Sequence, residues 1–171
     1  LDIETVPLAS CYDDLSEDKQ KLWEKKCQII GKYLSDEEAD VSNLYNRAGI
    51  YAEFGKIVCI SAGYFSNDSF RIKSFYGEDE KELLKEFAQL AEQYFSRSKH
   101  RLCAHNGKEF DFPYIARRML INGIKLPPIL NIAGKKPWEN PHLDTLEMWK
   151  FGDYKHYTSL ELLASVFDIP T

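Results

Sequence analysis

The sequence lacks several features that would set it apart from ordinary globular proteins. It has no apolar run of about 18 residues that could form a membrane span, and no low-complexity tract or repeat of roughly 20 to 50 residues. It also lacks a basic excess, since 22 Lys and Arg against 27 Asp and Glu give a formal charge of −5. Broad coating of nucleic acid by a basic face is therefore disfavoured, whereas a site that balances phosphate with bound cations is not.

The sequence also lacks any C-x-x-C pair, because its four cysteines (Cys11, Cys27, Cys59 and Cys103) are scattered. This pattern predicts no zinc site and a reducing, cytoplasmic setting. Cys59 and Cys103 lie in apolar, strand-like runs. We expect both to behave as small buried apolar residues.

Both ends of the chain read as cut. Leu1 is not an initiator residue, and L-D-I-E-T at residues 1–5 reads as the end of a strand whose beginning is missing. The lack of a targeting signal therefore carries no weight. We expect one domain over residues 1–171, with a helical insertion at about 8–55 after the first strand. The apolar stripe in this insertion, typical of an amphipathic helix, is formed by Trp23, Cys27, Ile30 and Leu34.

Apolar periodicity predicts alternating strands and helices after the insertion. Strands are expected at 57–65, 70–75 and 102–104, the first two joined as a hairpin by a turn at Asn67-Asp68-Ser69. Helices are expected at 78–97, 112–120 and 159–166, with Pro113 in the first turn of the second. This order predicts an α/β fold with a mixed central sheet flanked by helices.

Two acidic residues of the first strand share one face. Asp2 and Glu4 are two residues apart, so both side chains leave the same side of a strand while Ile3 points into the core. At a rise of roughly 3.3 Å per residue the carboxylates lie about 7 Å apart, within reach of one divalent cation. A D-x-E pair is also common on the polar face of an edge strand, so the pair alone does not identify a metal site.

A third acidic candidate lies in the loop after the strand at 102–104. Asn106 and Asp111 flank a tight G-K-E-F loop at the start of a helix. Asp111 fits a helix N-cap. It also fits a third carboxylate at the carboxyl end of the sheet, where ligands collect in open α/β folds. In that second interpretation Asn106 orients Asp111 or holds the substrate.

Together these segments resemble a known family. L-D-I-E-T is similar to the first motif of the DEDD class of ribonuclease H-like 3′–5′ exonucleases, and A-H-N-G-K-E-F-D-F-P at residues 104–113 is similar to the second. The segments F-G-K-I-V-C-I-S-A-G-Y-F, K-P-W-E and H-L-D-T-L-E-M-W-K more specifically resemble predicted exonucleases related to the proofreading domain of B-family DNA polymerases. The resemblance covers most of the chain, and the helical insertion matches least.

The resemblance implies a ribonuclease H-like fold and a metal-dependent enzyme that hydrolyses phosphodiester bonds at 3′ ends. In that family four carboxylates hold two ions, Mg²⁺ or Mn²⁺. Three of these catalytic, metal-binding residues would be Asp2, Glu4 and Asp111, and the substrate contacts would be Thr5, Asn106 and Phe110. The implied partner is a nucleic acid with a free 3′ end, DNA being favoured over RNA, and no membrane is involved.

The fourth carboxylate of that family belongs to a third motif, Y-x-x-x-D or H-x-x-x-x-D, which this sequence lacks. His156 followed by Glu161 comes near the pattern but supplies the wrong acid. Asp144 is better interpreted as a helix N-cap with Glu147 as its capping-box partner. We therefore expect the chain to stop short of its last catalytic motif, near Asp168.

Two other functions fit the same residues. One is a catalytically degenerate domain of this fold that serves as a nucleic-acid or protein binding module. The other is a different ribonuclease H-like nuclease, such as an endonuclease or a structure-specific enzyme. Four basic residues could contact phosphates, but we expect them to be solvated surface charges: Arg117, Arg118, Lys135 and Lys136.

Overall fold

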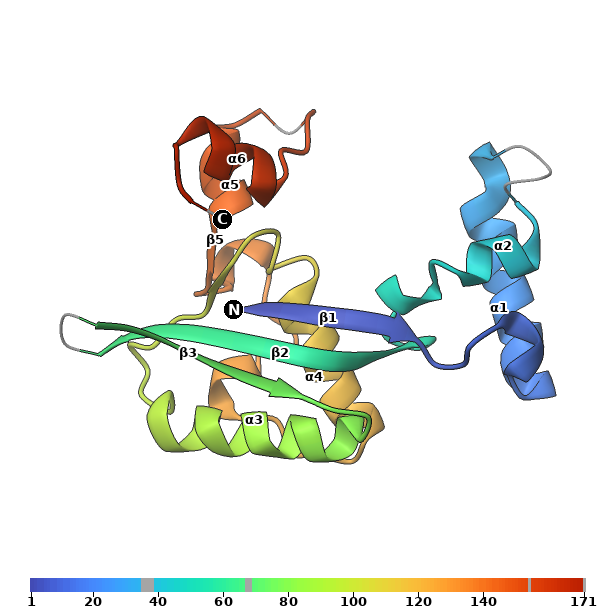
Figure 1. Cartoon of the computed structure of the whole chain (residues 1–171), viewed down its shortest axis with the longest axis horizontal. Coiled ribbons are helices and arrows are strands. Elements are labelled where there is room, and N and C mark those ends of the chain that lie inside the picture. The colour runs from blue at the N-terminus through green and yellow to red at the C-terminus, as the bar shows by residue number, and fades with distance from the viewer. Residues whose placement is uncertain (35–38, 67–68, 154, 171) are drawn as a thin grey trace.

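A three-stranded antiparallel sheet forms the centre of the protein. The structure is a computed structural model that describes residues 1–34, 39–66, 69–153 and 155–170. The strands are β1 (Asp2–Pro7), β2 (Gly55–Ser66) and β3 (Ser69–Tyr76), in the order β1-β2-β3 (Figure 1). The predicted hairpin is confirmed by the pairing of β2 with β3. Asn67 and Asp68 of its predicted turn lie outside the described residues.

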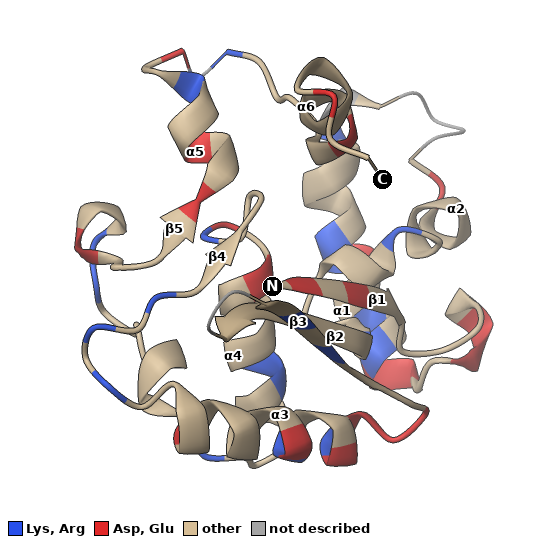
Figure 2. Ribbon diagram, turned by 60° about the vertical axis from the view of Figure 1, so that its left-hand side comes forward, with Lys and Arg blue, Asp and Glu red and all other residues tan. Residues whose placement is uncertain are grey.

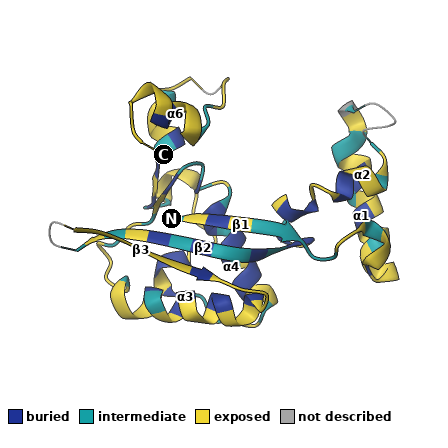
Figure 3. Cartoon of the chain, viewed as in Figure 1, coloured by how far each residue is buried: buried dark blue, intermediate teal, exposed yellow. Residues whose placement is uncertain are grey.

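Two helices cover one face of this sheet and bury the main hydrophobic core. They are α3 (Glu80–Tyr94) and α4 (Asp111–Ile121), and both were predicted to within a few residues. Their inward sides carry apolar residues at helical spacing, such as Leu84, Phe87 and Ile115, which pack on Ile57 and Ile60 of β2. Figure 3 shows the buried residues of both helices turned toward the sheet.

A short parallel pair of strands lies beside the carboxyl half of the chain. β4 (Cys103–Ala104) pairs with β5 (Leu143–Asp144), which leads directly into α5 (Thr145–Lys150) and later into α6 (Leu160–Val166). The ammonium group of Leu1 donates a hydrogen bond of 2.8 Å to the carbonyl oxygen of Cys103. The start of β1 therefore lies next to β4.

The segment between β1 and β2 is helical, as expected, and has its own small core. It contains α1 (Glu17–Ile30) and α2 (Val41–Tyr45), together with short 3-10 turns at Tyr12–Asp14, Gly31–Tyr33 and Ala48–Ile50. Trp23 is fully buried there against Tyr45 and Phe54. Two further 3-10 turns follow α4, at Pro128–Leu130 and Pro137–Glu139.

One predicted surface charge proves to be buried. Arg118 is 5% exposed, and its guanidinium donates hydrogen bonds to the carboxylate of Glu80, which is 8% exposed. Burial raises the pKa of Glu80, but the bonds from Arg118 and from the main-chain N–H of Ile57 hold it below its ordinary value. Because the partner lies 38 positions earlier in the chain, the sequence pattern around Arg118 did not reveal the pair.

Two predictions of buried cysteines are wrong. Cys103 is exposed because it alternates with Ala104, which is the inward residue of β4. Cys59 is only half-buried because it pairs with Glu4 on the sheet face opposite α3 and α4. In contrast, Cys27 of α1 is buried.

Among the described residues, no helix is both long and apolar enough to span a membrane.

Candidate functional site

The structure brings Asp111 and Asp2 together although they are far apart in the sequence. Asp111 is 4% exposed at the first position of α4, and its carboxylate accepts a hydrogen bond from the main-chain N–H of Ile3. Burial, and next the charge of Asp2, raise the pKa of Asp111 to about 6. The acidic positions of β1 and the acidic start of α4 are seen near the N-terminus in Figure 2.

This placement corrects one interpretation of Asp111. The N-cap of α4 is Phe110, whose side chain makes no capping bond, and Asp111 is already helical. A buried carboxylate beside a second carboxylate is costly when both are ionised. The N-cap interpretation of Asp111 is therefore wrong, and its ionised form is favoured by main-chain N–H groups, including that of Ile3, and by the Leu1 ammonium.

Glu4 lies on the predicted face but is not drawn into the same cluster. Asp2 pairs with Ser61 and Glu4 with Cys59, so both acidic side chains leave one face of the sheet, while Ile3 is buried on the other. In the described part of the chain, no three His, Cys, Asp or Glu side chains are close enough to hold a metal ion. Asp2 and Asp111 supply oxygen donors of the kind that Mg²⁺ prefers, and Glu4 is exposed on the strand.

A loop anchored by Asp144 sets the position of Asp111. One carboxylate oxygen of Asp144 accepts hydrogen bonds from the main-chain N–H of Asn106 (2.9 Å), and the other from that of Lys108 (3.0 Å). Asp144 is 4% exposed and also caps α5 through the N–H groups of Leu146 and Glu147. The predicted N-cap is confirmed, but its hold on the loop was missed because it depends on the pairing of β4 with β5.

The same loop contains a glycine that the close packing requires. A Cβ atom at Gly107 would lie 2.4 Å from the Cβ of Ala104 and 2.9 Å from the ring of Phe112. Asn106 before it adopts a left-handed backbone with φ of 61°, which Asn tolerates better than most residues. The N-G pair of the motif is thus needed to turn the chain between β4 and α4.

Comparison with known proteins places the chain in a family. A family described as a predicted 3′–5′ exonuclease related to the exonuclease domain of PolB matches residues 50–171. The chain belongs to this family. No curated protein and no solved structure matches the chain.

The match to the exonuclease family includes some candidate residues and leaves out others. It covers Asn106, Phe110 and Asp111, whereas Asp2, Glu4 and Thr5 precede its first residue. The case for the β1 carboxylates therefore rests on their motif and on the proximity of Asp2 to Asp111. Within the described residues, no hydrogen bond joins the amide of Asn106 to Asp111, and Asn106 is half-buried.

Structural contacts account for two of the residues expected to bind substrate. Thr5 is half-buried, and its hydroxyl hydrogen-bonds to Tyr114, which itself donates to the carbonyl of Gly49 at 2.6 Å. Phe110 packs its ring on Tyr114, with centroids 5.3 Å apart. The contact of Thr5 with Tyr114 joins β1 to α4, whereas that of Phe110 lies within the start of α4.

The pair that comes nearest to the expected third motif lies on the surface. His156 and Glu161 are exposed. His105, which was not singled out, joins three segments of this exonuclease-family fold: its Nδ1 lies 3.0 Å from the hydroxyl of Thr145, and its Nε2 lies 2.8 Å from the carbonyl of Thr158. The signal for His105 was its place directly before Asn106, at the end of β4. The capping box predicted for Glu147 is wrong, because Glu147 forms an ion pair with Lys108 instead.

Replacing Asp144 with Ala is expected to destabilise the fold by about 2 kcal/mol, since a helix cap and two loop hydrogen bonds are lost. Faster hydrogen exchange at the amides of Asn106 and Lys108 would locate the effect. Asp79→Ala is the matched control, because Asp79 caps α3 through one N–H group, that of Glu82. It should cost about 1 kcal/mol and leave the loop unchanged. Equal exchange rates at Asn106 and Lys108 in all three proteins would contradict the anchoring role of Asp144.

Proposed function

We propose that this chain is the core of a divalent-metal-dependent 3′–5′ exonuclease that hydrolyses phosphodiester bonds at the ends of nucleic acid. The observation that carries the proposal is the buried carboxylate of Asp111 beside Asp2, with a pKa raised to about 6. Carboxyl groups whose pKa is raised because a neighbouring negative charge disfavours the ionised form are typical of functional sites. Membership of the exonuclease family supports the same reaction class.

Asp2, Glu4 and Asp111 are the residues that would hold Mg²⁺ or Mn²⁺. Such ions lower the pKa of water and neutralise charge on phosphate oxygens during an in-line displacement. The protein contributes placement: Asp144 fixes the loop, the Ile3 N–H orients the Asp111 carboxylate, and Glu4 is exposed on the same sheet face as Asp2. The exposed side of Asp2 leaves room for the phosphate of a terminal nucleotide.

The proposal includes a ribonuclease H-like sheet. In that arrangement β1 lies between β2 and β4, giving the order β3-β2-β1-β4-β5 with a parallel half and an antiparallel half. The hydrogen bond from the Leu1 ammonium to the Cys103 carbonyl supports the neighbourhood of β1 and β4. The parallel pairing of β4 with β5 supports the second half.

A binding module without catalysis is the second candidate. It is favoured by one observation, that no three potential ligands among the described residues lie close enough to hold an ion. A module would bind nucleic acid without cleaving it, whether or not divalent ions are present. An enzyme of the proposed kind would require the ions for cleavage.

The test is a Mn²⁺ titration of the full-length protein with matched DNA and RNA oligonucleotides. With a 5′ label we expect a ladder that shortens from the 3′ end, and with a 3′ label immediate release of a labelled mononucleotide. EDTA should stop both. Internal cleavage as the first product would favour an endonuclease instead, and no cleavage at any Mn²⁺ concentration would favour the binding module.

A further inference from the structure

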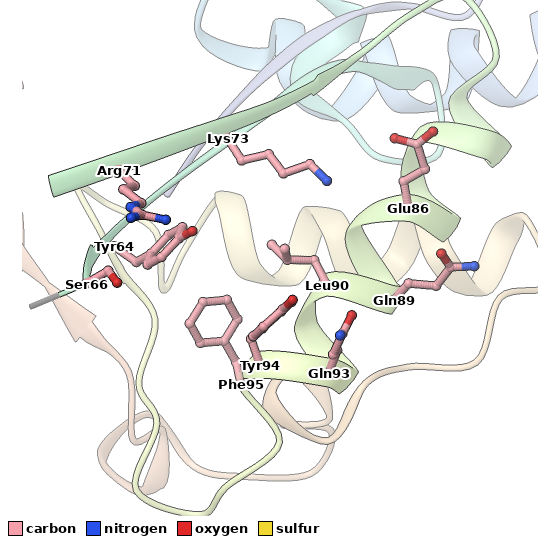
Figure 4. A pocket seen from close by; sticks show the side chains of 10 residues that line it. All are labelled: Tyr64, Ser66, Arg71, Lys73, Glu86, Gln89, Leu90, Gln93, Tyr94 and Phe95. Atoms are coloured by element: carbon pink, nitrogen blue, oxygen red, sulfur yellow. The ribbon is translucent and has the colours of Figure 1, made fainter. Parts of the chain in front are cut away.

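A groove on the far side of the sheet from Asp2 has the chemistry of a nucleic-acid contact. It lies between the outer part of the β2–β3 hairpin and the carboxyl-terminal half of α3, and its volume is about 890 Å³ (Figure 4). Arg71 and Lys73 project into it from β3, and Tyr64 and Tyr94 line it from β2 and α3. We propose that this groove binds single-stranded nucleic acid upstream of the end that is cleaved.

The charges of the groove favour an anionic strand. Arg71 and Lys73 are both exposed, and within the described ranges neither forms an ion pair. The Lys73 ammonium lies over the ring of Phe75, 4.6 Å from its centroid. One acidic residue, Glu86, lines the same groove, so two cations face one anion. Such a local excess of positive charge is unexpected in a chain whose formal net charge is −5. It would attract phosphates, since Lys and Arg gain affinity for nucleic acid by releasing counterions.

The rings of the groove favour bases over free phosphate. The Tyr94 side chain is 59% exposed, and Tyr64 is held edge-on against Phe95 with ring centroids 6.3 Å apart. A ring that is packed on one side and open on another is a platform for base stacking, which tolerates any sequence. Gln89 and Gln93 add amide groups along the same wall (Figure 4).

The hairpin connects this groove with the acidic site. Asp2 pairs with Ser61, and Tyr64 lies three residues further along β2 on the opposite face, roughly 10 Å away along the strand. A second hollow has lining residues from both sheet faces: Asp2, the rings of Phe65 and Phe70, which are 81% and 56% exposed, and Phe95, which also lines the groove. A single strand could therefore leave Asp2 along these rings and reach Arg71 and Lys73 around the hairpin. The inference rests on the proposed function, and the cations and tyrosine rings of the groove fit a strand of nucleic acid.

The test measures binding without catalysis. The full-length protein is titrated, in EDTA, into a 5′-fluorescein oligothymidylate of about 15 nucleotides, a length that matches known single-strand site sizes. The double variant Arg71→Ala/Lys73→Ala should bind about 10-fold more weakly. The slope of log K against log salt concentration should fall by about 1.4, since each single-strand phosphate contact contributes about 0.7.

Two sets of controls separate the groove from general electrostatics. Lys21→Ala/Lys25→Ala removes the same charge from exposed positions on α1, at the other end of the molecule from the hairpin (Figure 1), and should leave the slope unchanged. Tyr94→Ala should weaken binding about 10-fold through lost stacking, whereas Tyr94→Phe, which keeps the ring, should not.

Three outcomes would overturn the inference. The first two are an equal loss of affinity in Arg71→Ala/Lys73→Ala and Lys21→Ala/Lys25→Ala, and no loss of affinity in either. The third is displacement of the oligonucleotide by inorganic phosphate or a mononucleotide at concentrations similar to that of the oligonucleotide. Nuclease assays of the same variants in Mn²⁺ keep the two proposals apart. Binding that depends on Arg71 and Lys73 without any cleavage would reject the exonuclease and retain the groove, and cleavage with unaffected binding would do the opposite.

Discussion

Replacing Asp111 with Asn is expected to abolish nuclease activity and, at pH 8, to stabilise the fold. An asparagine keeps the acceptor for the Ile3 N–H but carries no charge beside Asp2. Loss of a ligand that supports metal catalysis removes several kcal/mol of transition-state stabilisation, which lowers the rate by about 1,000-fold. In wild-type protein without metal, the buried charge of Asp111 costs roughly 1 to 2 kcal/mol after allowance for screening by solvent.

The pKa shift of Asp111 determines at which pH the variant is more stable than the wild type. The pKa of Asp111 rises on folding from 3.8 to about 6, so the folded state binds the proton more tightly than the unfolded state. The stability from this group is fully present below pH 4 and is lost as the pH rises through 6. The variant should therefore match wild type at pH 4 and exceed it in urea denaturation at pH 8. Saturating Mn²⁺ should reverse the order by stabilising wild type alone.

Replacing Glu80 with Ala is expected to destabilise the protein by about 3 to 5 kcal/mol, because Arg118 would be left charged and unpaired in the interior. The Glu80 carboxylate accepts hydrogen bonds from the Arg118 guanidinium, from the Ile57 N–H at 2.7 Å and from the Asn122 amide at 3.0 Å. It thus joins α3, β2 and α4 in one network. Equilibrium unfolding in urea measures the loss.

Glu82→Ala is the matched control for Glu80. Glu82 lies two positions later in α3, and its ion pair with Lys85 is exposed, so its removal should cost under about 1 kcal/mol. The double replacement Glu80→Leu/Arg118→Met should recover much of the stability, since it removes both charges. A loss from Glu80→Ala no larger than that from Glu82→Ala would contradict the structural role of the pair.

The sequence predicts the elements of this fold better than their contacts. The helices over 80–94 and 111–121 follow from apolar residues at helical spacing, and the β2–β3 hairpin follows from an apolar run, a turn and an alternating segment. The shared face of Asp2 and Glu4 follows from strand alternation in the same way. By contrast, the pairing of Glu80 with Arg118 depends on how α3 packs on α4, which no local pattern records.

The same difference between local patterns and long-range contacts applies to the candidate site. The motif around Asp111 suggested a carboxylate close to β1, and the structure brings Asp111 to Asp2 and Ile3. The sequence could not indicate that Asp144 holds the Asn106–Lys108 loop, because the contact forms only after β4 and β5 pair across 40 residues. The expected convergence of Glu4 with the other two carboxylates remains a prediction.

The most direct test of the account is the titration of the Asp111 carboxyl carbon by ¹³C NMR with and without Mg²⁺. Without the ion we predict a midpoint near pH 6, and with saturating Mg²⁺ a lower midpoint, since a bound cation favours the ionised form. Asp2→Asn should lower the midpoint without Mg²⁺, by removing the neighbouring charge, and reduce the effect of Mg²⁺. A midpoint that Mg²⁺ leaves unchanged in the wild-type protein would contradict the assignment of Asp111 as a metal ligand.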